Sequence, residues 1–319
     1  MADPTPFKRS TLQLGPGTIV IGDIAVADPA PVKLYDSTGI ELTPDRATKD
    51  LPSSLVGKAG IIFTDRIFRI AATPVGEVSQ ALVNILYPWR NLTGKIGGMI
   101  HDPDKDVPLY IHSTSGKLTT FGNSILTRPP ELVLSTVETS FGQAEFSCLT
   151  PGDKTSKDPM LGIEAKPYDL GVHGTPLSGA VYTAKFGGLV IDSTVNGFRV
   201  NVEPEITPLE VDESGVLTWI LRGLRVTARC TPTQLDEKAI LDALGINRGR
   251  GMSAAGTDPL VITGTGLIKT VTLERAALTQ GPLKWGSGEL RAGELLFEAN
   301  AKTDGSLFNI VVEDPPIDK

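Results

Sequence analysis

The chain is poor in the residues that most often hold metals or act as nucleophiles. Of its 319 residues, two are cysteines and three are histidines. None of His101, His112 and His173 stands at metal-ligand spacing with a cysteine or another histidine, so we expect no metal site. Cys148 and Cys230 each lie inside an apolar strand pattern, which predicts two reduced, buried thiols rather than a disulfide.

Long apolar runs and an excess of positive charge are also missing. No segment approaches the roughly 18 consecutive apolar residues that a membrane helix needs, and the first residues lack the apolar core of a signal peptide. We therefore expect a protein that is made and kept in the cytosol, with no membrane partner. Lys+Arg 30 against Asp+Glu 37 gives a net charge of −7. This balance argues against a surface that grips nucleic acid phosphates.

No nucleotide-binding or calcium-binding loop is complete. The segment 101–106 begins like a calcium loop, but Val107 stands where that loop requires glycine and Ser113 where it requires glutamate. Each Gly-Lys pair lacks the glycine that a phosphate-binding loop carries five residues earlier. The sequence thus predicts no cofactor.

What the chain does contain is glycine, proline and short apolar patterns, and these signals occur twice. Gly 34 and Pro 24, with 40% hydrophobic residues, favour many strands joined by turns. Thr73-Pro74 returns as Thr231-Pro232, an offset of 158 (232 − 74), and Asp36-Ser37-Thr38 returns as Asp192-Ser193-Thr194. A duplicated unit of about 150 residues explains the series. The domains we expect are 1–150 and 180–319, joined by a linker at 151–179.

Each unit is predicted to be mainly β, with one helix. A strand whose buried parity switches at Gly223, and near Asp65 in the first half, requires a bulge or bend at that point. Each bent strand runs into Thr-Pro, which predicts a helix capped by the threonine, with the proline at its first position. The fold class is therefore two tandem β-sandwich or flattened barrel domains, each with one α-helix packed on the sheet. The first helix carries an apolar stripe of Val78, Ala81, Leu82, Ile85 and Leu86.

Two long, polar, proline-containing segments precede the bent strands. They are 41–57 and 202–215, and we expect them to be loops. Long loops in a compact β domain are either solvated hairpin tips or contacts with partners.

The repeated Asp-Ser-Thr also raises an enzymatic alternative. Aspartic proteases have two related lobes, each of which contributes one aspartate to a shared dyad. That family places glycine where Thr38 and Thr194 stand here, so a β-turn explains the motif better than a dyad does.

A strand-rich domain of about 150 residues, with a helix after a long bent strand and a long polar segment before it, resembles the tail tube fold of long-tailed bacteriophages. The resemblance covers about 11–150 and 178–312. It implies a structural virion protein of siphophage type with no catalytic residues. Such a protein polymerises in the host cytoplasm into the tail tube, the conduit for DNA ejection. Two domains per chain would close a pseudo-hexameric ring as a homotrimer.

The resemblance also implies partners and contact residues. The partners are other copies of the chain, the tape measure, terminator and distal tail proteins, and DNA that passes through the lumen without specific binding. In this family the segment before the bent strand reaches the neighbouring ring. The candidate inter-ring contacts are therefore Pro44, Asp45, Asp50, Glu203, Glu205, Glu210, Asp212 and Glu213.

Three alternatives remain open. A distal-tail or terminator ring protein would share the fold but would cap a tube rather than form it. A two-domain β binding module and an enzyme of another type are the readings from other classes.

Overall fold

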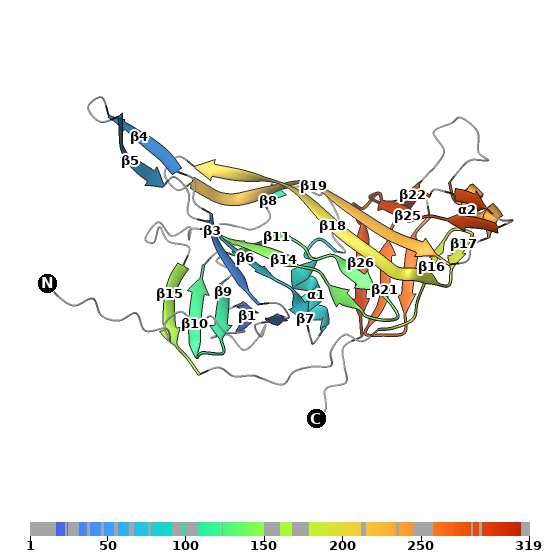
Figure 1. Cartoon of the computed structure of the whole chain (residues 1–319), viewed down its shortest axis with the longest axis horizontal. Coiled ribbons are helices and arrows are strands. Elements are labelled where there is room, and N and C mark those ends of the chain that lie inside the picture. The colour runs from blue at the N-terminus through green and yellow to red at the C-terminus, as the bar shows by residue number, and fades with distance from the viewer. Residues whose placement is uncertain are drawn as a thin grey trace.

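The computed structural model shows a mainly β chain with antiparallel strand pairing and two short helices, as the sequence predicts (Figure 1). The helices are α1 (Gln80–Leu86) and α2 (Glu237–Ala243). Neither has the length or the apolar character needed to cross a membrane, and no other helix occurs among the residues described. The structure describes residues 17–22, 24, 32–36, 39–45, 48–53, 57–63, 67–75, 78–90, 98–99, 108–122, 124–149, 160–167, 179–211, 215–233, 236–244, 258–281, 283–286 and 289–313.

The first half of the chain supplies two sheets and a separate hairpin. One sheet has the order β15 (Met160–Ala165), β10 (Lys117–Phe121), β9 (Leu109–Ser113), β1 (Gly17–Ile21), β2 (Val32–Asp36) and β7 (Pro74–Val75). The other has the order β11 (Ser124–Arg128), β14 (Ala144–Cys148), β6 (Ile67–Ala72) and β3 (Glu41–Asp45). The hairpin consists of β4 (Thr48–Ser53) and β5 (Gly57–Phe63).

The second half repeats this plan, with two of its strands much longer than the rest. One sheet has the order β26 (Phe308–Val312), β21 (Ile268–Leu273), β20 (Leu260–Gly264), β16 (Tyr182–Phe186) and β17 (Leu189–Ile191). The other runs β22 (Ala276–Gln280), β25 (Leu295–Ala299), β19 (Gly215–Pro232) and β18 (Thr194–Val211), followed by β12 (Leu132–Leu134) and β13 (Ser140–Phe141) from the first half; β8 (Gly98–Met99) also pairs with β19. The hairpin β23 (Leu283–Gly286) and β24 (Glu289–Ala292) stands apart.

The strand orders of the two halves correspond one to one. The order β11-β14-β6-β3 matches β22-β25-β19-β18, and β15-β10-β9-β1-β2 matches β26-β21-β20-β16-β17. A shared irregularity fixes the register. Thr127 and Thr279 each sit at a register shift, and the hydroxyl of each donates to a carbonyl of the neighbouring strand, that of Glu145 or Leu296, at 3.2 Å. A bulge with the same residue and the same hydrogen bond marks equivalent positions.

One apolar core runs through both halves. Its largest fully buried side chains include Phe121, Phe198, Phe297 and Phe308. Tyr87, after α1 in the first half, meets Phe308 of the second half edge to face, with ring centroids 6.5 Å apart. The halves are therefore packed together through side chains that are fully withdrawn from water.

The predicted helix starts are wrong, although each half does have its helix after the bent strand. α1 begins after Ser79, whose side chain accepts from the N–H of Leu82 at 3.1 Å, and α2 begins after Asp236. Pro74 lies in β7 and Pro232 ends β19. The carboxylate of Asp36 accepts a hydrogen bond from the N–H of Thr73 at 2.6 Å, and Pro74 lies opposite Asp36 in the strand pair. The chain therefore stays extended there. Of the predicted stripe, Val78, Leu82 and Leu86 are buried, whereas Ala81 is exposed and Ile85 half-buried.

The bend predicted at Gly223 is confirmed. Glu205 lies opposite Gly223 and Ile206 opposite Leu221, so Arg222 is the extra residue of a bulge. The matching bend near Asp65 lies outside the described residues.

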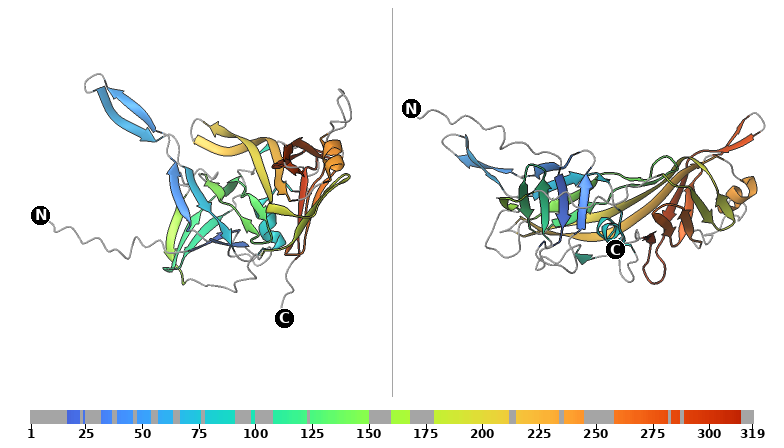
Figure 2. Two further views of the ribbon diagram at one scale, coloured as in Figure 1. Left: turned by 45° about the vertical axis from the view of Figure 1, so that its right-hand side comes forward. Right: turned by 90° about the horizontal axis from the view of Figure 1, so that it is seen from below.

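The segments expected as loops are largely strands. β3 and β4 occupy most of 41–57, and β18 continues through Val211. The hairpin β18–β19 reaches from the second half across the first (Figures 1 and 2). The segment expected as a linker contains β15, which pairs with β10 and extends the first half beyond residue 150. Proline-containing strands of this length are tolerated because they form hairpin arms rather than the centre of a sheet.

Candidate functional site

The described residues bring together no metal-binding cluster. No group of three His, Cys, Asp or Glu side chains in this part of the chain is placed to hold a metal ion. His112 is buried, with Nε2 3.2 Å from the carbonyl oxygen of Lys166. His101 and His173 lie outside the described residues.

The two cysteines are buried and unpaired with each other, as predicted. Burial raises the pKa of the Cys230 thiol to about 12 and that of the Cys148 thiol further still. Both therefore carry their protons at neutral pH and are poor nucleophiles.

The aspartate of the first Asp-Ser-Thr motif accepts hydrogen bonds from the backbone. The carboxylate of Asp36 accepts from the N–H of Thr73 and from that of Gly39, which closes the turn after β2. In the second half Ser193 makes the matching link to Thr233, since its carbonyl accepts from the N–H of Thr233 at 3.1 Å, and Asp192 is exposed. The turn interpretation is confirmed for Asp36, whereas in the second half residues 192–193 simply connect β17 to β18.

The two halves meet at a junction where β12 adds to the edge of β18. Leu132 lies opposite Val200, Val133 opposite Arg199 and Leu134 opposite Phe198. Leu132, Leu134 and Val200 are fully buried there. This strand addition extends a sheet of the second half with a hairpin that belongs to the first.

A glycine makes this strand addition possible. Gly197 has φ +76°, and a Cβ on it would lie 2.2 Å from the carbonyl oxygen of Leu134. Only a residue without a side chain allows the two backbones to approach so closely at a left-handed position.

α1 forms a second part of the same junction, because it lies against β26 as well as β2. Gln80 Oε1 accepts from the N–H of Val312 at 3.0 Å, and Arg90 Nη1 donates to the carbonyl of Ile310 at 3.4 Å. The Tyr87 hydroxyl donates to the carbonyl of Pro130 at 2.8 Å, which ties the end of the helix to the segment before β12. Helix and hairpin thus dock onto the second half together.

The four-strand paths of the two halves lie edge to edge, with β11 beside β18. A groove of about 330 Å³ marks the seam, with Arg128 and Glu145 on the first-half side and Asn201 and Glu203 on the other. Further along the seam, Ile125 of β11 packs in one apolar cluster with Val216 and Trp219 of β19, although no hydrogen-bond partner is seen for the buried Trp219 indole N–H. The seam is apolar at one end and polar at the other.

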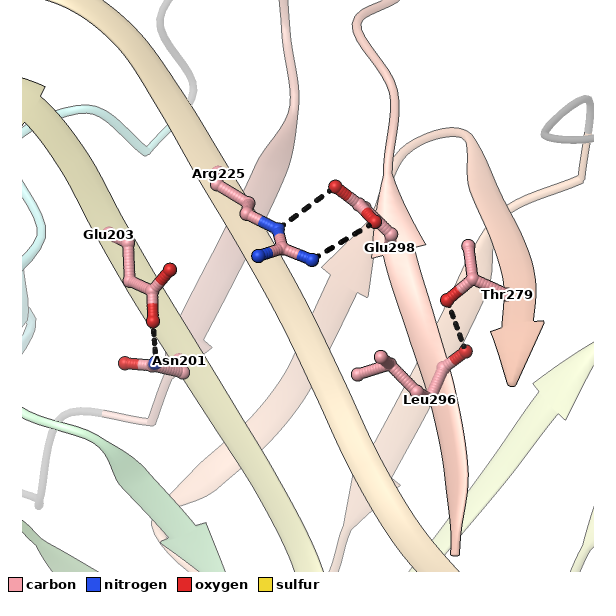
Figure 3. Close-up of polar contacts among 6 residues, drawn as sticks. All are labelled: Asn201, Glu203, Arg225, Thr279, Leu296 and Glu298. Atoms are coloured by element: carbon pink, nitrogen blue, oxygen red, sulfur yellow. Dashed lines mark hydrogen bonds and ion pairs between the residues drawn. The ribbon is translucent and has the colours of Figure 1, made fainter. Parts of the chain in front are cut away.

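The outer face of these paths is polar and carries charges of both signs. Figure 3 shows it in the second half. Arg225 of β19 donates to Glu298 of β25 at 3.0 and 3.5 Å, and Asn201 donates to Glu203 at 2.8 Å along β18. In the first half Arg69 lies 3.7 Å from Glu145. The face is therefore neither apolar nor a continuous patch of one sign.

The described candidate inter-ring residues lie on the sheet strand β3 and on the hairpins β4–β5 and β18–β19. Pro44 and Asp45 lie on β3, and Asp50 is exposed on β4. Glu203, Glu205 and Glu210 are exposed along β18, whereas Asp212 and Glu213 lie outside the described residues. Sequence reasoning missed the residues of the junction, although the apolar Leu132-Val133-Leu134 and the glycine at position 197 are visible signals of a strand and a close approach.

No protein-family model matches the chain, and no curated protein matches it. What the chain does must therefore be argued from the repeated strand order and the junction between its halves.

Proposed function

We propose that this chain is a structural protein that polymerises as stacked rings into a bacteriophage tail tube, a conduit for DNA ejection. Each half would be one tail-tube domain, so three chains would build a ring with six domain positions. The observation that carries the proposal is the matched strand order of the halves, which stand edge to edge as β3-β6-β14-β11 and β18-β19-β25-β22. Two equivalent positions side by side are what neighbouring sites in a ring require.

The charge pattern of the outer face fits a DNA conduit. An unpaired arginine on a lumen wall would attract each passing phosphate and slow the DNA. Arg225 and Arg69 are paired with Glu298 and Glu145, which reduces their attraction to phosphate. Arg199 and Arg229 lie exposed opposite each other on the same face, without an ion pair among the described residues. The net charge of −7 also reduces the attraction to phosphate. We assign this face to the lumen.

The two hairpin arms are the proposed contacts between successive rings. β4–β5 and the distal part of β18–β19 extend beyond the sheets from which they start (Figure 2). Thr48 and Phe63 are opposite each other, so an Asn-Gly turn can replace 48–63 without stretching the chain. The truncated protein should fold and form rings that no longer stack into tubes. Normal tubes from this variant would remove β4–β5 from the interface.

Negative-stain electron microscopy of the purified protein tests the function itself. A tube protein gives hollow tubes with rings about 40 Å apart, the size of one domain layer. Single rings that never stack would favour a distal-tail or terminator protein, and monomers at all concentrations would refute the proposal in favour of a two-domain binding module.

A further inference from the structure

We propose that the chain joins a second copy of itself head to tail, by the same docking that joins its own two halves. The hairpin β23–β24 of one copy would add to the edge of β3 in the next, while α2 would cover β15 of that copy. This deepens the proposed function, since it names the surfaces that would close the ring. It rests on the proposed function only for the closure into a ring, because the docking itself follows from the internal repeat.

The hairpin β23–β24 is the counterpart of the docked hairpin β12–β13. Phe146 lies opposite Ile70 and Phe297 opposite Ala228, which gives offsets of 151 (297 − 146) and 158 (228 − 70). With the offset of 151, the pair of Leu132 and Phe141 becomes Leu283 and Ala292, which are indeed paired. Yet β12 continues into a six-strand path, whereas β23–β24 forms a two-stranded sheet that pairs with no other described strand.

The edge of β3 is the counterpart of the edge of β18 that receives β12. In its sheet β3 is the last described strand, with β6 on one side only. The two offsets convert the pair of Leu132 and Val200 into Leu283 opposite Leu42. The next pair sets Lys284 opposite Glu41, which brings opposite charges together across the strands. An edge and a hairpin that no other described strand pairs with are complementary.

Two glycines at equivalent positions support the same docking. Gly197 allows the close approach of β12, and the offset of 158 makes Gly39 its counterpart. Gly39 also has a positive φ, +105°, but a Cβ on it would meet nothing within 4 Å. The open space at Gly39 leaves room for a close neighbour that the described part of the chain does not supply.

β15 lacks the cover that β26 has. Ile111 and Ile262 are equivalent at the offset of 151 (262 − 111), and they lie opposite Thr119 and Val271. The next partners across the sheet, Ile163 and Ile310, are therefore equivalent. Ile310 is fully buried on the strand that α1 packs against, whereas Ile163 is 59% exposed. Because the two sheets have the same register, the exposed Ile163 indicates that β15 lacks a helix like the one that covers β26.

α2 presents the surface that would supply the cover. It lies against β17 as α1 lies against β2. The caps Ser79 and Asp236 set the two helices at an offset of 157 (236 − 79). Leu86 and Tyr87 at the end of α1 are fully buried, but their counterparts Ala243 and Leu244 are only half-buried. Contact with β15 of the next copy would complete their burial. A head-to-tail contact of this kind closes into a ring where its rotations add up to a full turn, and otherwise gives an open chain.

Two complementary variants test the docking. In the first, an Asn-Gly turn replaces 283–292, which removes the hairpin but keeps the first-half surface. In the second, E41K and I163D block the first-half surface but keep the hairpin. Each variant alone should remain monomeric. Mixed in equal amounts they should form a dimer of two 33.8 kDa chains, because one intact docking surface of each kind remains. Light scattering coupled to size-exclusion chromatography measures the mass.

Controls separate docking from loss of fold. Val190, 45% exposed on β17, gives the matched variant V190D, which should assemble like the unchanged chain. E41K alone should weaken association about two- to fivefold per junction, and adding K284E should restore it, because the charges are then exchanged. Circular dichroism of every variant should match that of the unchanged chain. A mixture that stays monomeric, or a double exchange that restores nothing, would overturn the inference.

The outcomes for docking and for function are distinct. If the unchanged protein forms tubes but the mixed variants do not dimerise, rings close through other surfaces and this inference is refuted alone. If the mixture dimerises but the unchanged protein forms only open chains, the docking holds and the tube function fails.

Discussion

Adding a single methyl group at Gly197 should weaken the junction between the two halves of the chain. A Cβ there would lie 2.2 Å from the carbonyl oxygen of Leu134, whereas such contacts do not fall below 3.0 Å. The substitution Gly197→Ala therefore forces β12 to move by about 0.8 Å (3.0 − 2.2). Leu132 and Leu134, both fully buried, move with it.

The expected loss of stability has two parts. Placing a Cβ at φ +76° costs about 1–2 kcal/mol. Overpacking against a backbone that cannot rotate away costs about 1–3 kcal/mol more. The free energy of unfolding should fall by about 2–5 kcal/mol in total. Gly39→Ala is the matched control, since it has the positive φ but open space, and should cost about 1–2 kcal/mol.

Guanidinium titrations followed by far-UV circular dichroism, at concentrations that keep the chain monomeric, measure both losses. The two should differ by about 2 kcal/mol. Equal losses would refute the reasoning, because the contact with Leu134 would then contribute nothing beyond backbone strain.

Three further changes report on other parts of the fold. Tyr87→Phe removes the hydroxyl that donates to Pro130 in the core, so the free energy of unfolding should fall by about 1–3 kcal/mol in denaturant titrations; no change would show that the bond is dispensable. Asp236→Ala removes the side chain that accepts from the N–H of Ala239 at the start of α2, and should cost about 1 kcal/mol in the same assay. The raised pKa of Cys230, about 12 against an ordinary 9.0, means that the folded chain keeps this proton longer than the unfolded chain does. Stability should therefore fall as the pH rises from about 9 toward 12, and Cys230→Ala should lessen that fall, which thermal unfolding at several pH values measures; an unchanged pH profile would contradict the assignment.

The sequence predicted those features that depend on local pattern. The mainly β class, one helix in each half and the bend at Gly223 follow from strand parity, the apolar stripe and a glycine, and all are seen. The repeated Asp-Ser-Thr marked a turn, and Asp36 closes one. These signals act over a few residues, so neighbouring side chains determine the outcome.

The features that were missed depend on partners distant in the chain. Thr73-Pro74 has the local chemistry of a helix start, yet Asp36, far away in sequence, holds it in an extended strand. The polar segment 202–211 has a loop-like composition, but pairing with β19 makes it a strand. Nothing near Leu132 indicates that its partner is Val200. Tertiary pairing overrides local propensity in each case.

The docking of β12 onto β18 also imposes an order of events during synthesis. Residues 132–134 leave the ribosome well before 198–200, with which they pair. Until that later strand is synthesised, Leu132 and Leu134 stay exposed to water and can pair with a neighbouring nascent chain. A fragment that ends after β15 would keep this apolar edge open. The first half should therefore aggregate when it is made without the second half.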